Sequence, residues 1–554
     1  MPTSGPELAR KYDRLKARRL MFDNLYDDLA EFEAPHRGRP SYLAQHAQTP
    51  GERQTDRLFD STAVEAAAVL AANMQGALSS PTLPWFRLKT RDDRLNQIKS
   101  VQDWLEHAEQ AMLLALRQSN FYAEAMEGWL DLAVFGTKCL YIGERDAAGG
   151  APWGGLLFRS HPVGSYVIDE GPDGLVDTIM REQQMSARVC LDQWGDACGD
   201  DLMNRAKSNP EDLVTILQVV TPRYDRNPNR MDSLNMPFAS CYIYLERRHV
   251  IQEGGFRDFS YAVPRWAKTS GEMYGRGPGM IALPDVRTLN KADESSLEAV
   301  NLGIRPPLLA NNDGVIGEID LRPWGVTVTE GPDALRALEM GTKFDMANLF
   351  LEERRGRIRR IFFWDQLQLP NEREMTYGEV ERRLELMRRI LGPTISRLEY
   401  EDLNVTVGRV FGIMLRRGQL GGDPPEELQG ADLDIEYEGP LAKSQRSGRL
   451  AALQQSLGLL APLLADPEML AILKENVNMD AMMRDVFQTA GAPSQWLADT
   501  RERDAKRKQR MEQQAAQQQL AQVEQMAGAA GKASPALKLL MGGAQGEPAQ
   551  EGAA

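Results

Sequence analysis

The stretch from residue 136 to about residue 270 constrains the fold most, because its pattern differs from that of the chain on either side. Segments such as "KCLYIGE", "TILQVVTPRY" and "CYIYLERRHVI" are short, rich in β-branched and aromatic residues, and separated by Gly, Pro, Asn and Asp. This pattern is typical of antiparallel strands joined by turns, with one helical insertion near residues 189–207. Because helical segments flank this block, we predict an α+β protein.

Long amphipathic segments surround the β-rich block. In residues 5–33, Leu8, Leu15, Phe22 and Leu29 recur at intervals of seven and form one apolar face of a helix. The fold is therefore predicted to be predominantly helical. Further helices are expected at 63–80, 98–118, 121–135, 280–303, 339–363, from 376 onward with a kink at Gly392-Pro393, and at 448–500.

Bulk properties exclude several classes of protein. A chain of 554 residues exceeds the size at which one core keeps growing, so several substructures are expected. The formal charge of −14 argues against a protein that coats DNA by neutralising it. Four cysteines do not make a disulfide framework in so long a chain, and they favour a reducing cytoplasm. We see no secretory signal, and the most apolar run, 456–473, is interrupted by prolines and charges, so no membrane span is predicted.

The chain carries no recognisable catalytic motif. It lacks the GxxxxGK[ST] loop of nucleotide-driven machines, and the glycine cluster "GRGPG" at 275–279 is better interpreted as a hinge before a helix. The five histidines are scattered, and the Cys190 and Cys198 pair has no second close pair that would complete a zinc site. No GxSxG nucleophile motif occurs. We therefore predict no catalytic residues, no metal and no cofactor.

One acidic segment leaves an enzymatic alternative open. Asp169, Glu170, Asp173 and Asp177 cluster around Gly and Pro. Metal-dependent nucleases bind their metal ions through such carboxylates, which would make the chain a DNA-processing enzyme. An acid-rich β-turn is the commoner explanation of the same pattern.

The densest basic cluster lies beside the bulkiest apolar one, in "EERRGRIRRIFFWDQLQLP" at 352–370. Five arginines fall within seven positions and are followed by Phe362, Phe363 and Trp364. On a helix, the arginines are either a solvated end that favours the C-terminal dipole or a set of phosphate contacts. A membrane-surface helix is a further possibility, which would fit a non-channel scaffolding or membrane-associated structural protein.

The order of local patterns resembles one family, the portal or head-to-tail connector proteins of short-tailed double-stranded DNA bacteriophages. The patterns are "LSSPTLPWFRL", "FGTKCLYIGE", "HPVGSYVIDEGPDGLVDTIMREQQMSARV", "YGRGPGMIALPDVRTLNKADESSLEAVNLGIRPPLLA" and the segment beginning "RIRRIFFWDQLQLPNEREMTYGEV". They cover most of residues 1–420 in the expected order. After about residue 425, the chain resembles the family only in being helical and Gln-rich.

The resemblance implies a structural ring without enzymatic activity, most often a dodecamer, at one vertex of the capsid. Double-stranded DNA would enter through the ring's channel during packaging and leave through it during ejection. The implied partners are terminase, then the tail adaptor and tail proteins, together with the major capsid and scaffolding proteins. No membrane and no small-molecule substrate are implied. The protein would be assembled in the host cytoplasm and belong to the virion, at the head-tail junction.

The resemblance also implies a division of the chain into portal regions. These are a wing at 1–279, a stem helix at 280–303, a clip at 304–335, a second stem helix at 336–363, a tunnel loop at 364–378, a long kinked helix of the wing at 379–424, a helical crown at 425–500 and a Gln/Ala-rich flexible tail at 501–554.

Site residues are predicted for three roles on the same basis. The DNA-channel candidates are Gln366, Gln368, Asn371, Arg357 and Arg359. The subunit-interface candidates are Arg354, Arg355, Arg360, Phe362, Phe363 and Trp364, and the candidates for clip contacts and adaptor docking are Pro306, Pro307 and Trp324.

Overall fold

The computed structural model describes residues 4–41, 55–92, 94–145, 153–230, 232–304, 308–310, 335–337, 344–364, 391–428, 433–437 and 503–517, with 455, 482–483 and 486. The chain divides into two compact units. The first comprises Met1–Asp93 and Trp104–Arg446, and the second comprises Arg94–Asp103 and Ser447–Ala554. All of the sheets and the contacts described below belong to the first unit.

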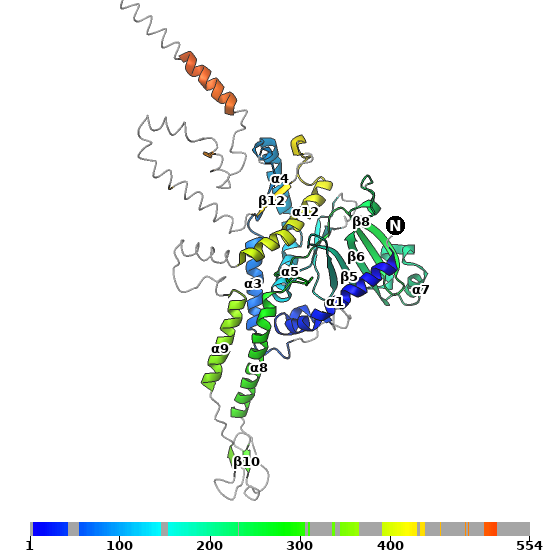
Figure 1. The fold of residues 1–554 in the computed structure, drawn as a ribbon, viewed down its shortest axis with the longest axis vertical. Helices are drawn as coiled ribbons and strands as arrows, with labels where there is room; N and C mark the ends of the chain where they lie inside the picture. The colour runs from blue at the N-terminus through cyan, green and yellow to red at the C-terminus, as the bar shows by residue number, and fades with distance from the viewer. Residues whose placement is uncertain are drawn as a thin grey trace, which may run out of the picture. The chain divides into compact units, whose positions relative to one another are not determined.

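Helices flank the sheets in the order that the sequence predicts (Figure 1). The helices are α1 (Gly5–Phe32), α3 (Thr62–Leu78), α4 (Lys99–Gln118), α5 (Phe121–Phe135), α6 (Ala187–Trp194), α7 (Asp200–Ser208), α8 (Pro278–Ile304), α9 (Phe344–Ile361) and α12 (Asn404–Arg416). Residues 391–398 are also helical and run into a π-helical turn, η6 (Glu399–Leu403), directly before α12.

The largest sheet has five antiparallel strands in the order β4-β5-β6-β7-β8. The strands are β4 (Tyr166–Glu170), β5 (Val176–Ser186), β6 (Leu213–Pro222), β7 (Phe238–Tyr244) and β8 (His249–Phe256). Neighbouring strands in this sheet are also neighbours in sequence, so hairpin connections suffice, except for the insertion of α6 and α7 between β5 and β6. The predicted antiparallel block with one helical insertion is thus confirmed.

Side chains along each strand point alternately to the two faces of this sheet, and both faces carry apolar residues. Leu217 and Val219 of β6 pack with Leu8, Tyr12 and Leu15 of α1, which crosses one face of the sheet (Figure 1). The preceding residues of β6 pack against the helical insertion, in a second cluster formed by Val214, Ile216, Cys190, Cys198, Leu202, Tyr244 and Ile251. Side chains two apart on a strand share a face, which explains why one strand serves both clusters.

Three smaller sheets complete the β-structure of the described residues. β2 (Leu140–Glu144) pairs with both β3 (Leu156–Ser160) and β9 (Tyr261–Ala262). β10 (Leu308–Ala310) pairs with β11 (Leu335–Ala337). β1 (Phe86–Thr90) pairs with β12 (Leu433–Tyr437) in an antiparallel ladder. The last pairing places a strand in the range 425–500, which we expected to be helical, because "LDIEY" alternates apolar and acidic residues and finds its hydrogen-bonding partner far away in the sequence. The assignment of this range to a crown stays a prediction.

The glycine cluster at 275–279 is a close-packing motif rather than only a hinge. A Cβ built on Gly275 would lie 2.1 Å from the carbonyl oxygen of Gly136, and one on Gly277 would lie 2.8 Å from the Gly136 nitrogen. Gly136 itself ends α5 with a left-handed φ of 76°. Two backbones therefore touch where α5 ends and α8 is about to begin, and only glycine permits that approach.

The remaining helix predictions agree with the structure where residues are described. The helix expected at 280–303 is α8, and the one expected at 339–363 is present from Phe344 to Ile361. In the long segment at 379–424, the described helix begins at residue 391 and ends at Arg416. Residues 503–517, which we expected to form part of a flexible tail, form a helix in the second unit. Most of the clip, tunnel-loop and crown ranges lies outside the described residues.

Candidate functional site

The arginine cluster lies on α9, which packs along α8. Leu351, Ile358 and Phe362 are buried and follow one another at spacings of seven and four, so they form a single stripe on one side of α9. The arginines flank this stripe. Phe362 is fully buried within its own chain, where it extends the helix core beyond Ile361.

Acidic residues of α8 bind the first arginines. The Arg354 guanidinium forms a hydrogen-bonded ion pair with Asp285, and Arg357 lies 3.6 Å from the other carboxylate oxygen of Asp285. Arg355 is 3.0 Å from Asp293, which lies about two turns beyond Asp285 on α8, and 2.8 Å from Glu352 on its own helix. The cluster therefore fastens α9 to α8.

Asp60 brings a third element to this junction. One of its oxygens accepts a hydrogen bond from the Thr62 backbone N–H at the start of α3, and the other accepts one from Arg355 at 2.8 Å. Burial favours the protonated form of Asp60, but the hydrogen bonds from Thr62 and Arg355 outweigh burial and hold the pKa of Asp60 below its ordinary value. The same hydrogen bond to Asp60 raises the pKa of Arg355. Both groups are consequently charged.

The chain leaves α9 through an unusual backbone conformation. Phe363 has a φ of 57°, in the left-handed region that residues other than glycine rarely adopt, and its N–H donates to the carbonyl oxygen of Arg360 at 3.1 Å. Its ring lies 6.5 Å from that of Trp266, so packing against the β-rich part holds the exit in place. Trp364 is the last described residue of this segment and is partly exposed.

The structure places the predicted site residues in different surroundings. Arg354 and Arg355 form ion pairs within their own chain, and Arg357 is half exposed. Arg359 and Arg360 lie in the last turn of α9, where Arg360 donates a hydrogen bond to the Gly356 carbonyl oxygen. Whether any of them contacts DNA or a second subunit stays a prediction. The channel candidates Gln366, Gln368 and Asn371 and the clip candidates Pro306, Pro307 and Trp324 lie outside the described residues.

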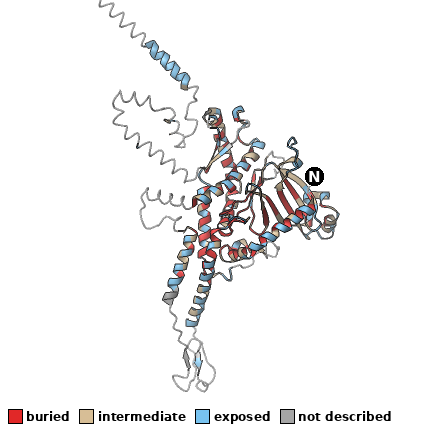
Figure 2. Ribbon diagram, in the orientation of Figure 1, coloured by how far each residue is buried: buried red, intermediate tan, exposed pale blue. Residues whose placement is uncertain are grey.

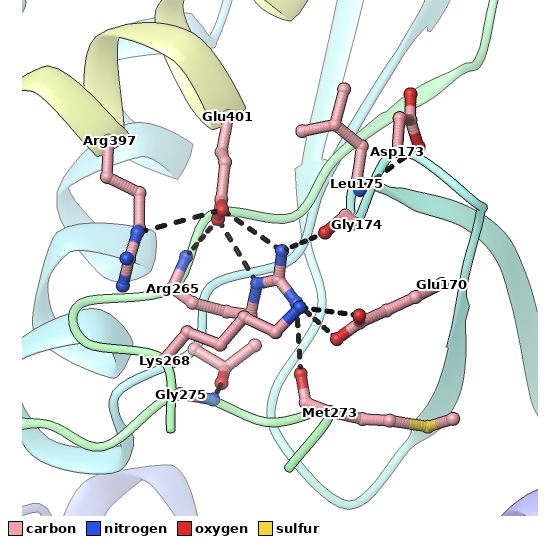
Figure 3. Close-up of polar contacts among 11 residues, drawn as sticks. Glu170, Asp173, Gly174, Leu175, Arg265, Lys268, Met273, Gly275, Arg397 and Glu401 are labelled. Carbon is pink, nitrogen blue, oxygen red and sulfur yellow. Dashed lines mark hydrogen bonds and ion pairs between the residues drawn. The ribbon is translucent and has the colours of Figure 1, made fainter. Parts of the chain in front are cut away.

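The acidic segment around residue 170 is occupied by cations of the same chain (Figure 3). Glu170 accepts hydrogen bonds from Arg265 and from Lys268, each at 2.6 Å, and Asp169 pairs with Lys11 at 3.0 Å. Asp173 and Asp177 accept hydrogen bonds from the Leu175 backbone N–H and the Thr178 hydroxyl. Within the described ranges, no group of three or more His, Cys, Asp or Glu side chains is arranged to hold a metal ion.

Arg265 is the centre of this network and was not singled out from the sequence. Its side chain is fully buried, and it donates to Glu401 of η6 as well as to Glu170 and to the Gly174 carbonyl oxygen (Figure 3). Its backbone N–H also donates to Glu401. The network ties the turn after β4, the segment after β9 and η6 together at one point.

The next residue of η6 makes a second buried ion pair. Asp402 lies 2.6 Å from the ammonium of Lys138, and both side chains are 1% exposed. The Lys138 ammonium also lies 4.2 Å from the centre of the Trp129 ring, a cation–π contact. A lone lysine in the apolar run "AVFGTKCLYIG" was the available sequence signal, since an isolated charge in a buried strand requires a partner.

A further arginine joins the helix after η6 to the β-rich part. Arg409 of α12 donates to the carbonyl oxygens of Ile142 and Asp258 at 3.2 and 2.8 Å. Three consecutive contacts, through Glu401, Asp402 and Arg409, therefore hold η6 and α12 against the strands. These contacts join segments that lie far apart in the sequence.

No helix among the described residues is both long and apolar enough to cross a membrane. The sequence model of a family described as "Bacteriophage head to tail connecting protein" matches residues 6–497 of the chain.

Two relatives match over nearly the whole length. The chain is 29% identical to the portal protein of Salmonella phage epsilon15, across 99% of this chain and 100% of the relative. It is 28% identical to the probable portal protein of Bordetella phage BPP-1, across 95% of this chain and 94% of the relative. A chain in the solved virion of a native gene transfer agent particle is 10% identical with a TM-score of 0.36, covering 75% of this chain and 94% of that one, a likeness too low to support an argument.

Proposed function

The chain belongs to the family of bacteriophage head-to-tail connecting proteins, and from that premise we propose that copies of it form a closed portal ring at one capsid vertex. Its role is that of a structural connector. The channel of the ring admits double-stranded DNA during packaging and releases it during ejection. The ring is dodecameric, docks terminase first and the tail adaptor later, and contacts the major capsid and scaffolding proteins around it.

The exposed apolar surface of the α8–α9 pair carries the ring proposal. Leu297, Val300 and Ile304 on α8 and Leu349 and Phe350 on α9 are large apolar side chains that their own chain leaves exposed, Ile304 and Leu349 to 72% and 75%. Figure 2 shows the half of α8 that ends at Ile304 largely in the colour of exposed residues. Exposed apolar residues gathered along a pair of helices are typical of a surface that a partner covers. In a closed ring, that partner is the next copy.

The regions of the portal are assigned on the same premise. We assign the wing to residues 1–279 with 379–424, the stem to α8 and α9, the clip to 304–335, the tunnel loop to 364–378 and the crown to 425–500. The ion pairs of Arg354 and Arg355 then brace the two stem helices within each subunit. Arg357 and Arg359, with Gln366, Gln368 and Asn371 of the loop, are the residues that we assign to the channel.

The acidic balance suits a channel through which DNA slides. Duplex DNA carries one negative charge per roughly 1.7 Å of axis, so a wholly basic bore would bind it tightly and oppose movement. A chain with a formal charge of −14 repels the duplex on average, and screening over about 8 Å at physiological salt keeps that repulsion mild. A few basic or polar residues then suffice to centre the DNA.

Electron microscopy of the purified protein tests the proposal directly. End-on class averages should show closed rings with a central hole, and mass photometry should give a multiple of the 61.9 kDa subunit. Particles that remain monomeric at every concentration tested would refute the ring. Liposome flotation and a nuclease assay with added divalent cations serve as controls, and neither is expected to give a signal.

A further inference from the structure

The two ends of the five-stranded sheet carry exposed side chains of opposite charge. At one end, Ser186 pairs with Leu213, and the chain between them is the insertion 187–212 that contains α6 and α7. At the other end, Pro222 pairs with Phe238, and the chain between them is the loop 223–237. β6 joins the insertion to the loop through ten residues, so the ends are about 30 Å apart.

The loop 223–237 contains three arginines and two aspartates, Asp225 and Asp232, so its net charge is +1, and it also presents an exposed tyrosine. Tyr224 is 83% exposed, and Arg226 and Arg230 are exposed as well. Neither arginine has an ion-pair partner within the part of the chain that the structure describes. Tyrosine and arginine are the residue types most enriched at the energetic centres of protein interfaces.

The loop is held in shape before any partner arrives. At its base, the Arg223 N–H donates to the Pro237 carbonyl oxygen at 2.8 Å, and the Arg223 guanidinium binds Glu253 at 2.6 Å. Further along, the Asn227 N–H donates to the Asn235 side chain at 2.9 Å. A preformed loop loses little conformational entropy on docking, which favours affinity.

The insertion 187–212 carries the complementary charge. It contains six carboxylates and three basic residues. Asp201 pairs with Arg247, Glu211 with Arg188, and Asp212 with Arg205. The three that remain are exposed and have no ion pair with any residue described: Asp192 at the end of α6, Asp196 in the turn η4 (Gly195–Cys198), and Asp200 at the start of α7.

These two surfaces cannot meet within one chain, because one sheet holds them apart. They can meet between copies arranged head to tail, and head-to-tail contacts generate closed rings when the rotation between copies closes. We propose that the loop 223–237 of each subunit docks onto the insertion 187–212 of the next, with Arg226 and Arg230 facing Asp192, Asp196 and Asp200. This inference rests on the proposed ring and names one contact that closes it.

A second copy fits the loop better than DNA does. Two arginines supply few phosphate contacts, whereas binding to duplex DNA gains most of its affinity from several such contacts. The acidic insertion is present in the same number of copies as the loop, so every contact in the ring is satisfied in the same way. Arginine and carboxylate groups also form paired hydrogen bonds of defined geometry, which fixes the orientation of one copy on the next.

Charge reversal in the full chain tests the docking. The loop variant carries Arg226→Asp with Arg230→Asp, the insertion variant carries Asp192→Arg with Asp196→Arg, and a third protein carries all four changes. We expect each of the first two to form rings at low salt only at a protein concentration higher by about tenfold than the unaltered protein, because like charges then face each other and little salt screens them. The four-fold variant should form rings at the original protein concentration, because opposite charges meet again at every contact. Tyr224→Ala should also raise the protein concentration at which rings form, and the charge reversals in the insertion should not restore it.

Matched controls separate the possible outcomes. Arg14→Asp with Arg18→Asp changes the charge of exposed residues on α1 equally and should leave the rings unchanged. Loop and insertion variants that form rings at the same protein concentration as the unaltered protein would refute the docking and leave the proposed ring intact, as would losses that the four-fold variant fails to reverse. Rings of normal stability that bind a labelled DNA duplex less tightly would assign the loop to DNA instead. An unaltered protein that forms no rings would refute the proposed function itself.

Discussion

The ammonium of Lys138 lies 2.6 Å from the carboxylate of Asp402, although 264 positions separate the two residues in the chain. Both side chains are almost completely buried, and the lysine stem passes so close to Gly128 that a Cβ there would lie 2.8 Å from it. The pair joins the connection between α5 and β2 to the π-helical turn before α12. It therefore holds together two segments that lie far apart in the sequence.

Removal of one member of this pair should destabilise the protein strongly. We expect Asp402→Ala to lower the free energy of unfolding by about 3–5 kcal/mol, because it leaves a buried ammonium without compensation. The double variant Lys138→Met with Asp402→Leu should recover much of that loss, since no charge remains buried. Denaturant unfolding measures both. The exposed pair of Arg188 and Glu211 supplies the control, and Glu211→Ala should change the stability by well under about 1 kcal/mol. Equal losses in the single and double variants would contradict the prediction.

Glu33 should make the stability depend on pH in a characteristic direction. The Glu33 carboxyl group is buried, both of its oxygens lack a hydrogen-bond partner among the described residues, and burial raises its pKa well above the ordinary 4.5. The folded state therefore binds the proton more tightly than the unfolded state. The stability that this group contributes is complete below about pH 4.5 and is lost as the pH rises toward the folded-state pKa.

The variant Glu33→Gln removes that titration. Its melting temperature relative to the unaltered protein should increase steadily from pH 4.5 to pH 8, whatever constant offset the amide introduces. Thermal melts at several pH values measure the difference. The exposed Glu211→Gln should show no such slope. A difference that stays constant over this range would mean that Glu33 is not protonated in the fold.

The contact between Gly275 and Gly136 should not tolerate a methyl group. Gly275→Ala would place a Cβ 2.1 Å from the Gly136 carbonyl oxygen, so one of the two backbones must move. We expect a loss of stability of more than about 2 kcal/mol, which is typical of overpacking in a tight core. By contrast, Gly76→Ala in α3 meets nothing within 4 Å and should stabilise the helix by up to about 1 kcal/mol. A similar response at both positions would argue against the close approach.

Charge reversal of Arg357 and Arg359 distinguishes a channel role from an interface role. Arg354 and Arg355 already hold α9 on α8, so Arg357→Glu with Arg359→Glu should leave the rings intact. We expect these rings to package DNA poorly, as measured by the DNA content of the particles that they form. Arg355→Glu, which places a carboxylate beside Asp60 and Asp293, should instead lower the thermal stability of the subunit. Rings that dissociate in the first variant would place both arginines at the subunit interface.

Trp324 offers a test of the predicted clip. Trp324→Ala should impair ring assembly or adaptor docking, because an aromatic anchor at a contact surface contributes a large share of its binding energy. Ring counts by electron microscopy and pull-down of the tail adaptor measure the two effects. Phe59→Ala, which truncates a partly exposed aromatic residue elsewhere, is a suitable control. Normal assembly and normal docking would mean that Trp324 contributes to neither contact.

Much of the secondary structure follows from local pattern alone. Leu8, Leu15 and Leu29 are spaced by multiples of seven residues, and this spacing predicts the helix α1. The turn residues between β-branched segments predict the antiparallel sheet. The strand Leu433–Tyr437 was missed, because a five-residue strand gains its stability from the partner that it pairs with, and β1 lies more than three hundred positions away. The π-helical turn was missed for a similar reason, because Glu401 and Asp402 form ion pairs with Arg265 and Lys138, which lie far away in the sequence.

The site shows the same division. The sequence indicated that the arginines of α9 are exceptional and that the chain carries no catalytic motif. It left open whether those arginines face solvent, DNA or protein, because that depends on the rotation of α9 and on the elements packed beside it. The positions of Asp60, Asp285 and Asp293 decided the matter for Arg354 and Arg355.

The sequence by itself determined the order of helices and strands, the absence of a nucleotide-binding loop and the resemblance to a family, because each of these depends on residues close together in the chain. Only the tertiary structure decided which charges are buried. Arg265, Lys138 and Arg409 resemble any surface cation in the printed sequence, yet each is held in the interior by partners far away. A buried charge is stable only where its partner stands within hydrogen-bonding distance, and that distance is a property of the folded chain.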